Sequence, residues 1–221
     1  MNILEHGVEI LRRFIPDAVV AQIIEEIETI DIGSGKYGIR NANKKFSAVA
    51  KLAASSLIQN KAKEILGAEP VLVRAIFFDK NPKKNWLVAW HQDKTIAVDR
   101  KIDIAGWGPW SIKDGVQHVQ PDVMLLNQML TFRVHLDAAN EENGCLKVIK
   151  NSHKFGVMTQ QQIDGVVSDC KVTNCVASAG DVLLMRPLTL HSSSKALKPA
   201  HRRVVHLEFC NYPLPSGLQW A

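Results

Sequence analysis

The sequence predicts an α+β protein in which N-terminal helices pack against one sheet of an antiparallel sandwich or barrel. Two observations lead to this fold class: helical periodicity in the first third of the chain, and many short strand-like runs separated by turns in the remainder. With 221 residues, of which 46% are hydrophobic and 22% charged, the chain is long enough for one large domain with a substantial core. We therefore expect a single domain over residues 1–221.

Residues 1–67 are expected to form the helical layer. In DAVVAQIIEEIETI, apolar residues recur at helical spacing directly after Pro16, which is typical of a helix start. The glycines of DIGSGKYG then interrupt the chain. A second amphipathic stretch runs over residues 46–66 and stops at Gly67, a residue type that favours the turn after a helix.

Residues 70–210 are expected to form the β-rich core. The strand-like runs are PVLVRAIFFD, WLVAWHQDKTIAV, MLLNQMLTFRVHLD, CLKVIK, GDVLLMRPLTLHSSS and RRVVHLEFC. Residues 94–121 overlap the end of the second run and continue toward the third. From residue 99 this segment is polar, contains glycine and proline, and is long for a simple connection. Because long loops in compact domains commonly serve a function, we expect this segment to be a lid over an active site.

Composition argues against several classes of protein. No apolar run approaches the roughly 20 residues that span a bilayer, so no membrane-spanning segment is expected. The N-terminal stretch MNILEHGVEILRRF lacks the basic-then-apolar layout of a signal peptide, and the cysteines form no CxxC pair. We therefore expect free thiols and a cytoplasmic protein.

The formal net charge of +5 is spread along the chain rather than concentrated in one block. Basic runs with interleaved aromatic residues are absent from the sequence, and only 6% of residues are aromatic, so we expect no nucleic-acid partner. A solvated basic surface is the plainer interpretation of this charge, and basic residues around a pocket for an anionic small molecule are the more useful alternative. The sequence gives no indication of the oligomeric state.

The stretch WHQDKT contains the first candidate site residues. In an extended chain, His91, Asp93 and Thr95 share one face, because successive side chains point to opposite sides. An imidazole beside a carboxylate forms a structural hydrogen bond, a catalytic dyad or part of a metal site. His191 ends the apolar run GDVLLMRPLTLH, where a side chain would project into a barrel mouth. Two histidines and one carboxylate match the facial triad of non-haem iron oxygenases, although zinc accepts the same ligands.

A basic residue lies at the start of the following strand-like run. Arg202 comes eleven residues after His191 (202 − 191 = 11), and an antiparallel return strand would bring it back beside the metal. The planar fork of arginine suits the distal carboxylate of 2-oxoglutarate, the co-substrate of one class of iron oxygenases. The adjacent Arg203 should face the other way, because side chains alternate along a strand.

The segments WHQD, ENGCLKVIKNSHKFG, GDVLLMRPLTLHSSS and AHRRVVHLEF together resemble the phytanoyl-CoA dioxygenase family over roughly residues 70–210. This resemblance implies a double-stranded β-helix, also called a jelly roll, and an enzyme that uses iron(II), 2-oxoglutarate and O2. It implies that His91, Asp93 and His191 bind iron, and that Arg202 and Ser193 hold the C5 carboxylate of 2-oxoglutarate. The implied reaction is hydroxylation of a small molecule with release of succinate and CO2.

Two positions refine what the resemblance implies. Halogenating relatives replace the carboxylate ligand with glycine or alanine, whereas this chain keeps Asp93, so hydroxylation is expected. The residue after the distal histidine is usually glycine in the family, and here it is Ser192.

Other residues are candidates for contact with the substrate. Arg74 and Arg133 lie inside strand-like runs, where each either lines the pocket or pairs with a nearby acid. Ile76 shares the face of Arg74 by alternation. Trp107 and Trp110, in the expected lid, are interpreted as residues that face the substrate.

The remaining histidines are assigned less specific roles. His118 is interpreted as an exposed loop histidine, although its position in the expected lid would let it reach a substrate. His135 is interpreted as a core residue, and His153 as a hydrogen-bonding residue that stabilises the fold.

Two other functions stay open at this point. One is a non-oxidative metal-binding jelly roll, such as an isomerase or a small-molecule sensor, in which Arg202 would have no anion to hold. The other is an oxygenase that acts on nucleic acid, which only the basic net charge favours.

Overall fold

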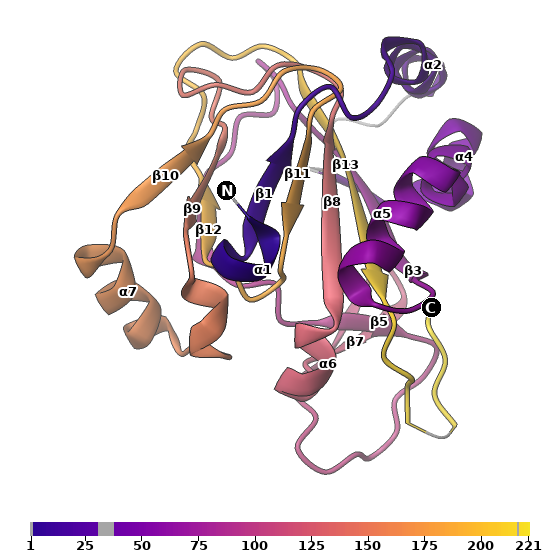
Figure 1. The fold of residues 1–221 in the computed structure, drawn as a ribbon, viewed down its shortest axis with the longest axis vertical. Helices are drawn as coiled ribbons and strands as arrows, with labels where there is room; N and C mark the ends of the chain where they lie inside the picture. Colours follow the sequence, from indigo (N-terminus) through magenta and orange to yellow (C-terminus); the bar gives the residue numbers. More distant parts are fainter. Residues whose placement is uncertain (1, 31–37, 216) are drawn as a thin grey trace.

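The computed structural model describes residues 2–30, 38–215 and 217–221 and consists mainly of two antiparallel sheets (Figure 1). Within these residues the larger sheet has six strands, in the spatial order β1 (Val8–Leu11), β11 (Val182–Met185), β8 (Met129–His135), β13 (Arg202–Cys210), β3 (Val71–Lys80) and β2 (Gly38–Arg40). The smaller sheet has four, in the order β10 (Val172–Cys175), β9 (Leu146–Ile149), β12 (His191–Ser193) and β4 (Val88–His91). Apolar residues of β1, β9, β10 and β11 pack together between the two sheets.

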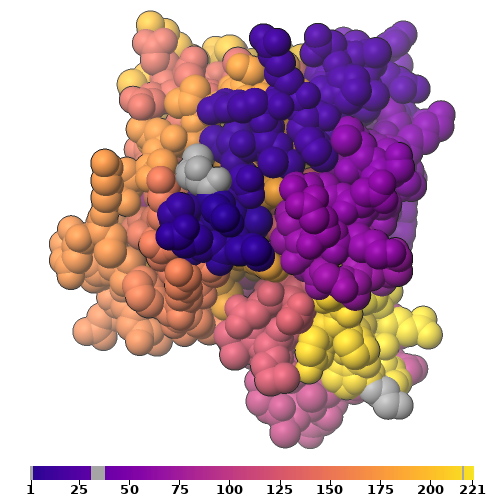
Figure 2. All heavy atoms as spheres, in the orientation of Figure 1, coloured from indigo at the N-terminus to yellow at the C-terminus, as the bar shows by residue number. Residues whose placement is uncertain are grey.

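Helices cover the outer face of the larger sheet. They are α2 (Asp17–Glu28), α3 (Ala42–Lys45), α4 (Ser47–Ala54) and α5 (Ser56–Leu66), and their buried residues form one hydrophobic cluster with β3, β8, β11 and β13. Figure 2 shows α4, α5 and the N-terminal residues as the outer surface on this side of the molecule. The predicted α+β class, with helices packed on one sheet, is confirmed.

The helices follow the sequence pattern with one break. In α2 the residues at helical spacing, Val20, Ile23 and Ile27, are buried. The stretch predicted over 46–66 is two helices, because Ser55 is extended and its side chain caps α5 by accepting the N–H of Ile58. Gly67 ends α5 with φ 75°, a left-handed conformation that glycine adopts without a steric cost.

The N-terminal layer also contributes strands, which the helical prediction missed. A short helix, α1 (Ile3–His6), leads into β1, which pairs with β11 at the edge of the larger sheet. Strand β2 pairs with β3 at the other edge. The glycine-rich break predicted at DIGSGKYG falls largely on residues 31–37, outside the described residues.

Strand β13 lies at the centre of the larger sheet, between β3 and β8. Its odd-numbered residues Val205, Leu207 and Phe209 belong to the cluster under the helices. Its even-numbered residues Arg202, His206 and Glu208 line a cavity on the opposite face. The two-residue period of a strand thus separates a hydrophobic face from a charged one.

Residues 94–121 are not the irregular loop that their composition predicts. They contain β5 (Ile96–Val98), β6 (Trp110–Lys113) and β7 (Val116–Val119), which pair as a third sheet in the order β5-β7-β6. The next segment also differs from the prediction, because part of the run that begins MLLNQ is α6 (Val123–Asn127), capped by the Asp122 side chain. Short strands with weak alternation leave little signal in a sequence.

Two further elements follow β9. The NSHKFG segment forms a 3-10 turn, η1 (Ser152–Phe155), and α7 (Gln160–Asp169) comes after it. A capping box between Thr159 and Gln162 marks the start of α7. Among the described residues, no helix combines the length and apolar composition needed to cross a membrane.

The packing of β13 against the helices yields a stability prediction. Phe209 is fully buried and contacts the Phe132 ring edge to face, with centroids 5.5 Å apart. Phe209→Ala should lower the free energy of unfolding by about 3–5 kcal/mol, because it removes a large buried side chain and leaves a cavity. Urea denaturation followed by circular dichroism measures this loss. Phe155→Ala is the matched control, since Phe155 is 57% exposed and its removal should change stability far less.

Candidate metal centre

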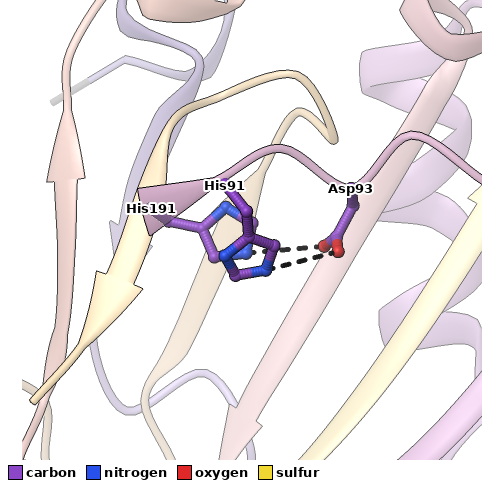
Figure 3. A group of neighbouring side chains, drawn as sticks. All are labelled: His91, Asp93 and His191. Atoms are coloured by element: carbon purple, nitrogen blue, oxygen red, sulfur yellow. Dashed lines mark ion pairs between the residues drawn. The ribbon is translucent and has the colours of Figure 1, made fainter. Parts of the chain in front are cut away.

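Neighbouring strands of the smaller sheet position the two histidines. β4 and β12 pair antiparallel with His91 directly opposite His191, and their ring centroids are 4.2 Å apart. Strand β4 ends at His91, so Asp93 lies two residues beyond it, where its backbone N–H donates to the carbonyl of Pro187 at 2.9 Å. Figure 3 shows that the three side chains point toward one another.

Gln92 anchors the turn that carries Asp93. Its side-chain amide donates to the carbonyls of Gly156 and Leu188 and accepts the N–H of Met158. Gln92 is buried, and these three hydrogen bonds satisfy its amide group on the side away from the histidines. The turn therefore holds the Asp93 carboxylate toward His91 and His191.

Hydrogen bonds set the tautomers of both histidines. Nδ1 of His91 lies 2.8 Å from the carbonyl of Ala89, and Nδ1 of His191 lies 2.8 Å from the carbonyl of Thr189. A carbonyl oxygen only accepts, so in each neutral ring Nδ1 carries the proton and Nε2 keeps its lone pair. Metal-binding histidines commonly donate their other ring N–H to a carbonyl in this way.

The three free ligand atoms converge on one point. The Nε2 atoms of His91 and His191 lie 3.8 and 3.6 Å from the carboxylate oxygens of Asp93, which is too long for hydrogen bonds. All three ligand atoms lie within 4.8 Å of one another. Because ligand bonds to such ions are about 2.0–2.2 Å long, this spacing fits two imidazoles and one carboxylate around a single divalent ion.

The charge states also suit a metal. Partial burial alone would raise the pKa of Asp93, but the neighbouring His191, His206, His91 and Arg74 hold that pKa well below its usual range. Burial lowers the pKa of His191 to about 4. At neutral pH the site therefore offers an ionised carboxylate and a neutral imidazole, the forms that bind metal ions.

A cavity of about 280 Å³ lies between the two sheets and includes these residues. Nine of the residues proposed from the sequence line it: His91, Asp93, His191, Arg202, Ser193, Arg74, Ile76, Thr95 and Arg133. Trp107 and Trp110, expected to face the substrate, do not line it; they pack against a hydrophobic cluster that includes Ile96 and Val98.

The two adjacent arginines at the start of β13 point to opposite faces, as alternation predicts. Arg202 is 3% exposed and lines the cavity, and its Nε and Nη1 atoms have no hydrogen-bond partner among the described residues. Burial lowers its pKa to about 10, so it stays charged at neutral pH. Arg203 instead donates to Asp137 and Glu28 outside the cavity.

The Ser193 hydroxyl hydrogen-bonds to other groups of the protein. Its hydroxyl donates to the carbonyl of Gly144 at 2.8 Å and accepts from Nζ of Lys80 at 3.0 Å. Its only proton is thus committed within the protein. Lys80 was missed in the sequence because a lysine at the end of a strand is usually solvated; here burial, with Arg202 and Arg133 nearby, lowers its pKa to about 7.

Arg74 meets both expectations, since it lines the cavity and also pairs with an acid. Its Nη2 donates to Glu208 at 2.6 Å, and Nε2 of His206 lies 2.9 Å from the same carboxylate oxygen. Burial alone would raise the pKa of Glu208, but Arg74 and His206 lower it, so the carboxylate is ionised. His206 and Glu208 were missed, although alternation from Arg202 places both on the inner face.

Two interpretations of histidines are wrong, and one agrees with the structure. His118 is not exposed; it lies on β7, is 2% exposed and lines the cavity. His153 forms no hydrogen bond among the described residues; its ring packs against Gly7, where an added Cβ would lie 2.3 Å from Nδ1. His135 is fully buried, as expected of a core residue.

The fold and the site define a class of protein: a jelly roll that carries a two-histidine, one-carboxylate centre between its sheets. The family model described as phytanoyl-CoA dioxygenase (PhyH) matches residues 3–204. The chain therefore belongs to the phytanoyl-CoA dioxygenase family, whose enzymes use iron(II), 2-oxoglutarate and O2, and the predicted membership is confirmed. A comparison with curated proteins finds no match to this chain.

Three solved structures illustrate the structural similarity. The non-heme alpha ketoglutarate dependent epimerase SnoN from nogalamycin biosynthesis has a TM-score of 0.69 at 16% identity, covering 99% of this chain and 81% of that one. EctD from S. alaskensis with 2-oxoglutarate and 5-hydroxyectoine has a TM-score of 0.71 at 18% identity, covering 94% and 73%. HygX from Streptomyces hygroscopicus with iron bound has a TM-score of 0.68 at 14% identity, covering 94% and 83%. These similarities confirm the predicted jelly-roll fold.

Metal binding is tested by removing the anionic ligand. Asp93→Ala should weaken iron(II) binding by more than the roughly 10- to 100-fold that follows from losing a residue hydrogen-bonded to a metal ligand, because it removes one of the three candidate ligands. Anaerobic titration with iron(II), with metal content measured after desalting, gives the affinity.

His153→Ala serves as the control for this substitution. Its ring packs near the chain segment of His191 without offering a ligand, so the variant should keep iron and lose only thermal stability. Unchanged iron affinity in Asp93→Ala, or loss of iron from a His153→Ala protein that melts normally, would show that the ligands are wrongly assigned.

Proposed function

We propose that this protein is an iron(II)- and 2-oxoglutarate-dependent dioxygenase that hydroxylates a small-molecule substrate and releases succinate and CO2. Membership of the phytanoyl-CoA dioxygenase family supports the enzyme class. The observation that carries the proposal is one cavity that holds both a preorganised triad and the unpaired, buried guanidinium of Arg202.

Each side chain has a role in this proposal. His91, Asp93 and His191 hold iron(II) on one side, which leaves the other coordination positions free. Arg202 binds the C5 carboxylate of 2-oxoglutarate, and Arg133, which lines the same cavity, adds a second positive charge. When bound, iron with 2-oxoglutarate and O2 supplies an oxidant strong enough to attack an unactivated C–H bond.

The walls of the cavity favour such chemistry. Ile76, Phe78, Trp86 and Val88 line it beside the triad, and they limit the access of water to the metal. These apolar side chains also orient an apolar part of the substrate near the iron. The protein therefore contributes positioning and exclusion of water, and the cofactors contribute the oxidation.

The alternative of a metal-binding isomerase or sensor without an oxidative role accounts less well for Arg202. Burying an arginine whose charge has no partner is costly unless a ligand compensates it. A site that needed only a metal would gain nothing from that cost. An anionic co-substrate beside the metal gives the buried charge a function.

Decarboxylation of 2-oxoglutarate tests the enzyme class directly. Iron-loaded protein in air should convert 2-oxoglutarate to succinate and CO2, faster when a true substrate is present, and a chelator should stop the conversion. Under 18O2, labelled oxygen in the second product indicates hydroxylation, whereas an unlabelled, stereochemically inverted product indicates epimerisation. No succinate under any condition would contradict the proposal.

The pair Arg202 and Arg203 provides a matched prediction on co-substrate binding. Arg202→Ala should weaken 2-oxoglutarate binding by roughly 10- to 100-fold and leave iron bound, because a charge-assisted bidentate contact contributes about 1.5–3 kcal/mol. The metal-to-ligand charge-transfer band of the anaerobic iron-loaded protein reports this affinity.

Arg203→Ala is the control, since it differs by one position and faces the opposite side. It should change 2-oxoglutarate affinity little and lower stability, because it breaks the hydrogen bonds to Asp137 and Glu28. A large loss of affinity in Arg203→Ala and none in Arg202→Ala would contradict the orientation of β13. No loss in either variant would remove 2-oxoglutarate from the proposal.

A further inference from the structure

The inner cavity has two charged ends, which lie far apart along β13. Arg202 marks the end assigned above to the C5 carboxylate of 2-oxoglutarate, here called the anchor end, and Arg133, in register with His206, lies between the two ends. Arg74, Arg40, Lys113 and His118 form the other end, here called the outer end, and they come from β3, β2, β6 and β7. Arg74 pairs in register with Glu208, six residues along β13 from Arg202, which is roughly 20 Å of extended chain. One five-carbon co-substrate cannot occupy both ends.

The cavity carries more positive than negative charge. Among the described residues that line it, five are arginine or lysine and two are carboxylates, Asp93 and Glu208. Binding of iron(II) and doubly charged 2-oxoglutarate leaves this excess unchanged, because their charges cancel. A positive excess in a partly enclosed space favours anionic ligands.

Ion pairs at the outer end compensate two of its three cations. Arg74 pairs with Glu208 at 2.6 Å, and Arg40 pairs with Asp114 at 2.7 Å. Lys113, on the strand next to His118, has no ion pair with any described residue. Lys113 lines the cavity and is half-buried.

The positive groups of the outer end affect one another's pKa values. Burial lowers the pKa of Lys113, and Arg74 and Arg40 lower it further. The same groups and Lys113 act on His118, whose pKa burial lowers to about 4, so His118 is neutral at pH 7. Among the described residues, Lys113 lacks the ion pair that Arg74 and Arg40 each have, and an anion beside it would offset its charge.

We propose that the substrate carries an oxyanion, a carboxylate or a phosphate, that binds Lys113 at the outer end of the cavity while its oxidised carbon lies near the metal. Neutral His118 offers a hydrogen bond beside this contact, and Arg40 adds positive charge. Ile76, which is in register with His206 on β13, gives an apolar contact for the part of the substrate between the two points. This inference rests on the proposed function and specifies the class of substrate for the same site.

Probes that share one alkyl chain and differ only in the head group test the inference. Hexanoate, hexyl phosphate, hexanamide and hexylamine are titrated calorimetrically into the full-length, iron-loaded protein, anaerobically and with saturating 2-oxoglutarate so that the anchor end is filled. At least one of the two anions should bind about tenfold or more tightly than the amide, and the amine should not bind. Whichever anion binds more tightly identifies a carboxylate or a phosphate.

Variants locate the anion. Lys113→Gln should weaken binding of the preferred anion about tenfold or more, and Lys113→Arg should largely retain it. Lys101→Gln, an exposed lysine outside the cavity, is the matched control and should have no effect. In each variant an intact charge-transfer band with 2-oxoglutarate shows that the rest of the site is folded.

Two results would overturn the inference: equal affinity for hexanamide and the anions, or undiminished anion affinity in Lys113→Gln. Failure of the proposed function looks different, because the wild-type protein would then form no charge-transfer band with 2-oxoglutarate. In that case the same titrations without co-substrate still decide whether Lys113 binds an anion.

Discussion

The alternation of buried faces along β13 is the constraint on which the site depends. One face contributes Val205, Leu207 and Phe209 to the core beneath the helices, and the other carries Arg202 and Glu208 into the cavity. A shift of one residue would place the charges among the helices and the apolar residues beside the metal, and both changes would be costly. The helical layer therefore affects the site without touching it. The helices bury the odd-numbered residues of β13, and this keeps the even-numbered residues facing the cavity.

The charged side chains that line the cavity fall into two kinds, those with an ion-pair partner in the protein and those without one. Arg74, Glu208 and His206 offset one another's charge through contacts of 2.6 and 2.9 Å, while Arg74 Nε and His206 Nδ1 have no hydrogen-bond partner among the described residues. Arg202 and Lys113 have no such partner among the described residues. The protein offsets the charge of the first kind itself, whereas the charge of the second kind is left to solvent or to a bound anion. This difference, rather than charge alone, separates wall residues from residues proposed to bind ligands.

Much of the site could be predicted from the sequence because it depends on local periodicity. Alternation separates Arg202 from Arg203, as predicted. Asp93 lies beyond the end of β4, and His191 begins β12 instead of ending one strand over GDVLLMRPLTLH, because that run is divided into β11 and β12. Lys113 and His118 could not be found in this way, because they reach the cavity through β6 and β7, strands of four residues each whose pairing brings distant segments together. Trp107 and Trp110 show the reverse error: aromatic residues in a polar segment look like substrate contacts, but here they are partly buried against a hydrophobic cluster that includes Ile96 and Val98.

The triad also joins two distant parts of the chain. Asp93 and His191 are 98 positions apart (191 − 93 = 98), and β4 and β12, which carry or precede these ligands, contain only four and three residues. An ion bound by both segments acts as a removable cross-link that closes a long loop, and it favours the folded state by mass action. Metal supply would then govern the lifetime of the protein as well as its chemistry, because the metal-free form lacks this cross-link between two of its shortest strands.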